Sequence, residues 1–122
     1  NLKKSVYHKN AFWICSSAGL VLYDGIYIRS VKIKKPNENI DVLDLWEDPV
    51  GKLWVITNRG LCVVHKNGKK QWINKQNGLA SNNLFSIEYF GKSLWIGSDK
   101  GIDCVQLNDN YELRRIEYFG KN

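Results

Sequence analysis

Three cysteines and two histidines are the side chains of this sequence best suited to covalent or metal chemistry. Cys15, Cys62 and Cys104 are separated by 47 and 42 residues, far from the Cys-x-x-Cys spacing that is typical of metal sites. Each cysteine lies inside an apolar run, so we interpret all three as small buried hydrophobic residues. His8 and His65 stand in no sequence context typical of a cysteine protease. We therefore predict no catalytic residue, no metal ligand and no cofactor.

Positive charge is the second chemical feature. The chain has 18 Lys and Arg against 12 Asp and Glu, a net charge of +6, and short basic groups such as Lys66, Lys69 and Lys70. This balance is compatible with an acidic polymer as partner, either nucleic acid or an anionic glycan. We favour a solvated lysine surface, whose charges also keep exposed strand edges from pairing with other chains. Because no nucleic-acid-binding motif and no apolar run of about 20 residues is present, we expect neither nucleic acid nor a membrane to contact this segment.

Two residue types recur along the chain with one common period. The shared pattern is apolar-Trp-apolar-x-(Ser/Thr)-x-x-Gly-apolar, and it aligns without gaps. We interpret the tryptophans as core residues between repeats, since a residue that recurs in every repeat is expected to have a structural role common to all of them. The markers, each separated by 41 and 41 residues, are Trp13, Trp54 and Trp95, and Gly19, Gly60 and Gly101.

Each repeat reads as four short β runs separated by turn residues. In the second repeat, glycine and asparagine in the turns supply the positive φ angles of tight hairpins. No segment of 11 or more residues shows helical periodicity. Four antiparallel strands in about 41 residues are typical of a propeller blade. The predicted runs are Asp41–Glu47, Lys52–Thr57, Leu61–His65 and Lys70–Asn74.

The predicted fold class is all-β: a β-propeller fragment of about three four-stranded antiparallel blades, with repeats at approximately 1–40, 41–82 and 83–122. Leu2–His8 is predicted as the first strand and Tyr111–Tyr118 as the last, which gives about twelve strands. Propellers close with typically 4–8 blades. A start at Asn1 without any Met fits a segment of a longer reading frame, so we expect further blades from a parent chain or self-association of the fragment.

The repeats resemble the two-component regulator propeller family. The resemblance rests on Leu53–Leu61 (LWVITNRGL), Leu94–Ile102 (LWIGSDKGI), the link Asn77–Leu84 (NGLASNNL) and Val42–Gly51 (VLDLWEDPVG). The family repeat reads G-x-L-W-I-G-T-x-x-G-L and then x-G-L-x-x-N-x-V. The first repeat departs from it with Cys15-Ser16 in place of Gly-Thr, and the second repeat has Ile56 in place of Gly.

This resemblance implies a function. Such repeats usually form the periplasmic sensor region of membrane-anchored hybrid histidine kinases that regulate polysaccharide use and respond to oligosaccharides. The chain itself contains no ATP-binding or phospho-acceptor motif, so we expect no enzyme activity of this segment and assign any kinase activity to the parent.

A ligand is then expected at one end of the propeller, where loops of successive blades converge. Amides and charged groups in those loops suit a hydroxyl-rich ligand, although Asn, Asp and Ser also favour turns without any ligand. The candidate binding residues are Ser17, Asn37, Asn39, Asn58, Arg59, Asn82, Asn83, Asp99 and Lys100.

Two other functions stay open at this point. Some propellers, such as streptogramin lyase, are enzymes, but a general acid or base constellation is not visible around either histidine. A protein-interaction scaffold of the WD40 kind has a similar blade length, but the Gly-His and Trp-Asp marks of that repeat are missing.

Overall fold

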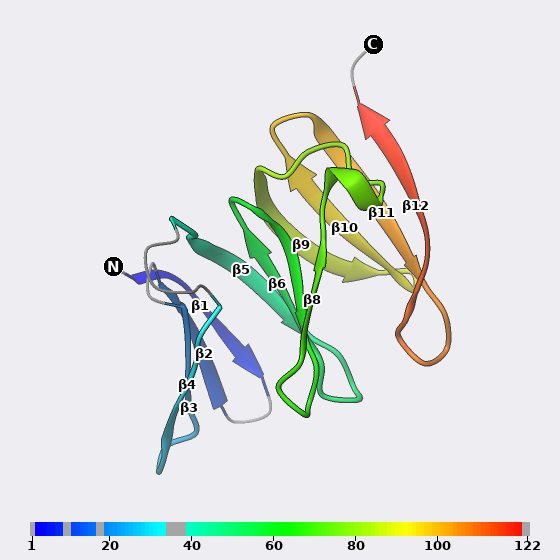
Figure 1. The fold of residues 1–122 in the computed structure, drawn as a ribbon. Coiled ribbons are helices and arrows are strands. Elements are labelled where there is room, and N and C mark those ends of the chain that lie inside the picture. The colour runs from blue at the N-terminus through cyan, green and yellow to red at the C-terminus, as the bar shows by residue number, and fades with distance from the viewer. Residues whose placement is uncertain (1, 9–10, 17–18, 34–38, 121–122) are drawn as a thin grey trace.

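The structure, a computed structural model, describes residues 2–8, 11–16, 19–33 and 39–120, and side chains from Phe12 onward within these ranges except that of Ser16. The described residues form twelve β-strands in three four-stranded antiparallel sheets, which lie side by side like blades of a fan (Figure 1). The strands are β1 Leu2–His8, β2 Ala11–Ser16, β3 Gly19–Tyr23, β4 Ile28–Val31, β5 Val42–Glu47, β6 Leu53–Thr57, β7 Gly60–Val64, β8 Lys70–Ile73, β9 Leu84–Phe90, β10 Ser93–Ser98, β11 Gly101–Leu107 and β12 Leu113–Gly120.

Each sheet is a meander in which sequential strands pair. The sheets β1–β4, β5–β8 and β9–β12 are called blades 1, 2 and 3. In such a meander the turn between the second and third strands lies at the same end as the segments that join blades. We call this end, with residues 39–41, 58–59, 74–83 and 99–100, the linker end. The opposite end, with residues 24–27, 48–52, 65–69, 91–92 and 108–112, is the hairpin end. The all-β blade architecture expected from the repeats is confirmed.

The strand limits differ from the prediction mainly at the C-terminus. β12 runs from Leu113 to Gly120, whereas Tyr111–Tyr118 was expected. Tyr111 adopts a positive φ of 60°, and Asn108 accepts hydrogen bonds from the backbone N–H groups of Asn110 (2.8 Å) and Glu112 (2.9 Å). The asparagine side chain closes the turn at this point, because Asn side chains compete with strand pairing for nearby backbone donors.

A continuous apolar layer joins blade 1 to blade 2. Trp13 is 1% exposed and packs with the faces of β6 and β7 that carry Val55 and Cys62. The apolar residues of this first seam are Trp13, Cys15, Leu20, Ile33, Ile40, Val42, Leu45, Leu53, Val55, Cys62 and Val64. β6 and β7 are buried at every position, since their opposite faces serve two different seams.

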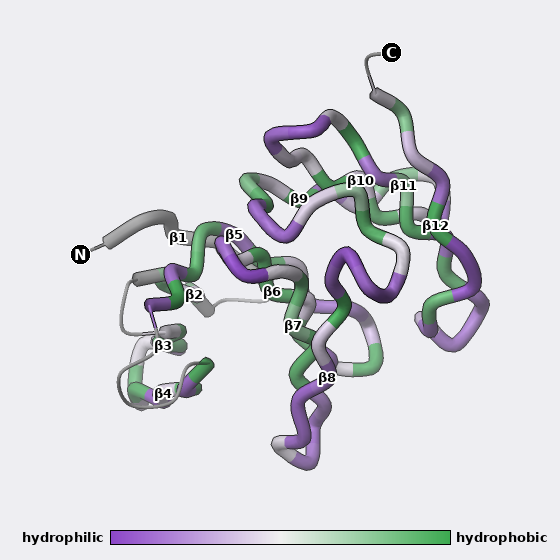
Figure 2. The backbone as a smooth tube through the Cα atoms, turned by 45° about the horizontal axis from the view of Figure 1, so that its top comes forward, coloured by the Kyte–Doolittle hydropathy of each residue, from purple (hydrophilic) through white to green (hydrophobic). Residues whose placement is uncertain are grey.

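The second seam, between blades 2 and 3, repeats this packing 41 residues later. Trp54 is 2% exposed and packs with Leu94, Ile96 and Val105. Figure 2 shows the apolar strands near the middle of the array and the hydrophilic turn between β7 and β8 at its tip. The buried residues of this second seam are Trp54, Ile56, Leu61, Val63, Ile73, Leu79, Leu84, Ile87, Leu94, Ile96, Val105 and Leu107.

The third tryptophan has a different environment. Trp95 is only half-buried, and its ring lies 6.1 Å from that of Phe119. Ile102, which corresponds to the fully buried Leu61 of blade 2, is 45% exposed, and Phe119 is 48% exposed. Trp95 therefore departs from the expectation of a core residue in every repeat, because the described chain places no blade against this face.

The recurring glycines are explained by the strand edge that faces them. Gly60 has a φ of +116°, and a Cβ at this position would lie 3.0 Å from the carbonyl oxygen of Ile73 and 3.3 Å from Cβ of Asn74. Gly19 and Gly101 show the same geometry, with a carbonyl oxygen 2.7 Å from the added Cβ. Each third strand thus begins with a residue that needs both a positive φ and close backbone approach.

Substituting Gly60 with Ala is expected to cost more stability than the same change at Gly68. Both glycines have positive φ, but a Cβ at Gly68 meets nothing within 4 Å. Each variant loses about 1 kcal/mol from the backbone conformation, and Gly60→Ala loses roughly a further 1 kcal/mol or more from the contact with Ile73. Urea unfolding of both variants measures the difference; equal losses would show that the carbonyl contact has no energetic role.

Candidate functional site

The candidate binding residues that the structure describes gather at the linker end, but hydrogen bonds within the turns hold several of them. Asn58 accepts a hydrogen bond from the backbone N–H of Asp41 through Oδ1 (2.8 Å), and its own N–H donates to the Asp41 carbonyl (3.3 Å). The pair fastens the β6–β7 turn to the segment that enters blade 2. Asn58 is therefore a structural link between two parts of the linker end.

The segment that joins blades 2 and 3 uses its polar side chains in the same way. Asn82 Oδ1 accepts from the backbone N–H of Lys75 (2.7 Å), at the start of a short 3-10 turn, η1 Lys75–Asn77. Ser81 donates its hydroxyl to Asp99 (2.5 Å) and accepts from the backbone N–H of Asn83 (2.9 Å). Asp99 N–H in turn donates to the Asn83 carbonyl (3.4 Å). This network brings three of the candidate residues, Asn82, Asn83 and Asp99, to one loop cluster.

Two charged candidates extend from these turns into solvent. Arg59 and Lys100 are both exposed, at equivalent positions of the β6–β7 and β10–β11 turns. Asn39 is also exposed, in the segment before blade 2. Ser17 and Asn37 lie outside the described residues. Arg59 and Lys100 bond to Thr57 and Ser98 through their backbone N–H groups, so replacing either side chain leaves those turn contacts in place.

A hollow of about 640 Å³ lies beside one of these turns, on the open side of blade 3. Asp99 and Lys100 line it together with Tyr118 and Phe119. The Tyr118 hydroxyl donates to the carbonyl oxygen of Lys100, which ties β12 to the β10–β11 turn. The hollow combines an aromatic wall with one acidic and one basic side chain, a mixture suited to a polar ligand with an apolar face.

A second hollow, at the hairpin end between blades 1 and 2, was not predicted as a site. It measures about 440 Å³ and is lined by basic side chains of both blades, among them Arg29 and Lys70. The sequence signal was the basic group around Lys66, Lys69 and Lys70, which we interpreted as a solvated surface. Sequence spacing gave no sign that residues of blade 1 face this group across a seam.

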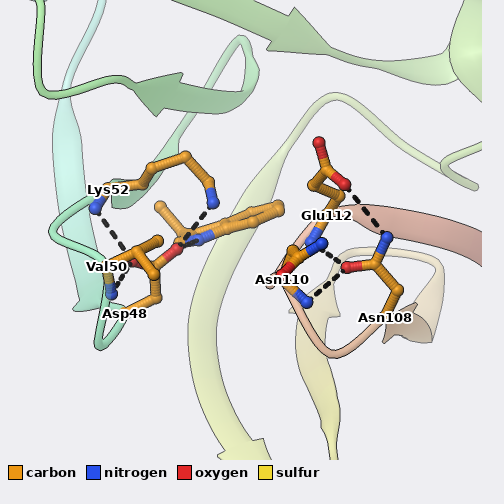
Figure 3. A network of polar contacts seen from close by, with 7 residues as sticks. Asp48, Val50, Lys52, Asn108, Asn110 and Glu112 are labelled. Atoms are coloured by element: carbon orange, nitrogen blue, oxygen red, sulfur yellow. Dashed lines mark hydrogen bonds and ion pairs between the residues drawn. The ribbon is translucent and has the colours of Figure 1, made fainter.

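Carboxylate and amide side chains hydrogen-bond the turns of the hairpin end (Figure 3). Asp48 Oδ1 accepts from the backbone N–H groups of Val50 (3.0 Å) and Lys52 (2.8 Å). Its Oδ2 accepts the indole N–H of Trp54 (3.0 Å) and pairs with Lys52 Nζ (3.0 Å). Asp48 thereby connects the β5–β6 turn to the tryptophan of the second seam. The turn around Asn108 lies at the same end, and Tyr111 within it packs against Trp46 of blade 2.

Two buried carboxylates lie in the second seam and differ in how well they are paired. Asp44 accepts the backbone N–H of Leu45 (2.8 Å) and, across the seam, that of Ile87 (3.1 Å). Asp103 is fully buried and accepts the Ala80 N–H through Oδ2 (3.1 Å), while its Oδ1 has no hydrogen-bond partner. Burial raises the pKa of the Asp103 carboxyl above its ordinary value of 3.8, although the bond from Ala80 opposes the shift.

The cysteines do not form a chemical site in the described structure. All three are buried, as the sequence predicts, and burial raises the pKa of the Cys62 thiol to about 12. Within the part of the chain that the structure describes, no group of three or more His, Cys, Asp or Glu side chains is placed to hold a metal ion. No helix among the described residues is long and apolar enough to cross a membrane.

Comparison with known proteins adds no assignment to this geometry. No protein-family model and no curated protein matches the chain.

Replacing Asp103 with Asn is expected to stabilise the protein at pH 7. Since the folded state raises the pKa of Asp103, the charged carboxylate destabilises the fold as the pH rises from about 4 through the folded-state pKa. Asn keeps an acceptor for Ala80 without the charge. The melting temperature of Asp103→Asn should exceed that of the wild type at pH 7, and the difference should disappear near pH 4.

Asp44→Asn is the matched control. Both carboxylate oxygens of Asp44 accept backbone N–H groups, and an amide offers only one acceptor oxygen. This variant should lose roughly 1–3 kcal/mol of stability. A pH-independent effect of Asp103→Asn would contradict the assigned role of the buried charge.

Proposed function

We propose that this chain is a segment of the ligand-sensing propeller of a two-component sensor, a histidine kinase and response regulator hybrid, and that its ligand is an oligosaccharide. The observation that carries the proposal is the convergence of equivalent β6–β7 and β10–β11 turns, with the joining segments, at one end of the blades. The motif resemblance described above supplies the signalling context: a periplasmic location, a parent anchored in the inner membrane, and a kinase located elsewhere in the parent.

The proposed binding surface consists of the exposed side chains at the linker end. Arg59 and Lys100 extend from turns of neighbouring blades, while Asn58, Asn82 and Asp99 hold those turns in place. Because the turns belong to different blades, a ligand that contacts both is sensitive to how the blades pack. Binding would then favour one packing of the seam over another and pass that preference to the parent. A protein-interaction scaffold is the alternative function.

A double variant, Arg59→Ala with Lys100→Ala, tests the binding surface. We expect a loss of about tenfold or more in affinity for the oligosaccharide that a glycan array identifies, since each removed contact to a polar ligand weakens binding by about 1 kcal/mol. Titration calorimetry measures the change. The matched control is Arg114→Ala with Arg115→Ala, which removes the same charge from exposed positions of β12. Unchanged affinity in the first variant would remove this surface from the site, and specific capture of a protein with no glycan signal would favour the scaffold.

A propeller function also requires further blades, and the outer faces of blades 1 and 3 support this. Phe12 and Tyr23 of blade 1 are 44% and 42% exposed, whereas their equivalents in blade 2, Leu53 and Val64, are buried against blade 1. The face of Trp95, Ile102 and Phe119 corresponds to the face of Trp54 that blade 3 covers. The outer face of blade 1 thus corresponds to the face of blade 2 that packs against blade 1. The outer face of blade 3 corresponds to the face of blade 2 that packs against blade 3.

For this 122-residue chain we infer that a second copy covers the open faces, with blade 3 of one copy against blade 1 of the other. Such a head-to-tail contact made twice closes a ring of six blades, within the range of known propellers.

Ile102→Lys tests the contact between copies. Light scattering after size exclusion should give a dimer mass for the wild type and a monomer mass for Ile102→Lys, because a buried lysine in the seam is not paired. Val50→Lys is the control, since Val50 is 50% exposed and lies in a hairpin-end turn away from the seam faces. A folded wild-type monomer, or equal dissociation of both variants, would contradict the inference.

A further inference from the structure

The hollow at the hairpin end has the composition of an anion site. Its walls come from two blades: β4 with the residues after it supplies Arg29 and Lys32, and the β7–β8 hairpin supplies Lys66 and Lys70. Against these four cations, the lining contains one carboxylate, that of Glu47. Because cations on opposite walls act on the same enclosed space, their potentials add there. Charge in this groove is therefore concentrated well beyond the average over the surface.

The seam below holds the blade 1 wall of the groove in place. The Arg29 guanidinium lies 5.6 Å from the centre of the Trp13 ring, within the range of a cation–π contact. The indole N–H of the same tryptophan donates to Glu47 Oε1 (3.4 Å). Trp13 itself is 1% exposed. A buried ring thus positions one cation and one carboxylate at the groove, which lowers the ordering cost of binding.

The floor of the groove is apolar and aliphatic. Val31, Leu53 and Val64 line it, and the last two are buried residues of the first seam. Among the described residues that line the groove there is no Phe, Tyr or Trp, and the half-buried His65 contributes a single imidazole ring. Single-stranded nucleic acids are held largely by stacking of successive bases on several aromatic rings, and one partly buried imidazole does not provide such a platform. Charged contacts around an aliphatic floor instead suit a saturated ring that carries anionic substituents.

We propose that this groove binds an acidic oligosaccharide, with sulfate or carboxylate groups paired to Arg29, Lys32, Lys66 and Lys70 and a sugar ring over the aliphatic floor. Its volume of about 440 Å³ lies in the range of small-molecule sites. The site is separate from the binding surface of the proposed function, which lies at the linker end. Arg29 provides a two-pronged donor, and the lysines provide point charges that adapt to the ligand.

Calorimetric titration with a sulfated tetrasaccharide, and with the same tetrasaccharide after desulfation, tests the proposal. We expect binding of the sulfated form that weakens with added salt and little binding of the desulfated form. The variant Lys66→Ala with Lys70→Ala should reduce affinity about tenfold or more, because two charge-assisted contacts are lost. Far-ultraviolet circular dichroism of each variant confirms that the sheets remain folded.

Two comparisons make the result specific. Arg114→Ala with Arg115→Ala removes the same charge outside the groove and should leave affinity unchanged; an equal loss would mean that net charge alone attracts the glycan. A single-stranded DNA oligomer of equal charge should bind more weakly; tighter binding of the DNA, or no binding of the sulfated tetrasaccharide, would overturn the proposal. Arg59→Ala with Lys100→Ala should retain the sulfated ligand, so failure at the linker end and failure at this groove are distinguishable.

Discussion

The burial of one apolar blade face against the next is the interaction on which the rest of this structure depends. A four-stranded sheet of this size has two faces, and neither β6 nor β7 has a solvated side. Trp54 anchors one seam and Trp13 the other, each almost completely buried. Truncation of such a tryptophan to alanine would cost about 3–5 kcal/mol, a large part of the stability of a domain of this size. The linkers and the hollow between blades 1 and 2 take their positions from these two seams.

Polar side chains set the registration of the seams. Asp44 accepts an N–H from its own blade and another from blade 3, which restricts how the two sheets can slide past one another. Glu47 of blade 2 accepts the indole N–H of Trp13 of blade 1, while the bond from Trp54 to Asp48 holds that second indole within blade 2. Apolar contact alone is non-directional. The bonds at Asp44 and Glu47 that cross the seams are directional, because a shifted blade would break them.

Most of the fold was predictable from the sequence because the fold repeats. The 41-residue spacing of Trp13, Trp54 and Trp95 identifies the blade, and the all-apolar runs identify the strands with two buried faces. What the repeat cannot show is where a face has no neighbour. Trp95 fits the motif as well as Trp54 does, yet it is half-buried, since the environment of a residue depends on the next blade and not on its own sequence.

The candidate site was less predictable, for a related reason. Asparagine and aspartate in turns serve either a ligand or the backbone, and residue type does not distinguish the two uses. In the structure Asn58 and Asn82 bind backbone N–H groups, while Arg59 and Lys100, in the β6–β7 and β10–β11 turns, are exposed. The basic groove was not predicted from the sequence, because Arg29 and Lys70 are 41 residues apart and come together only across a seam. Residues about one blade length apart in the sequence can face each other across a seam. In the sequence alone, such pairs are not distinguishable from charges dispersed over the surface.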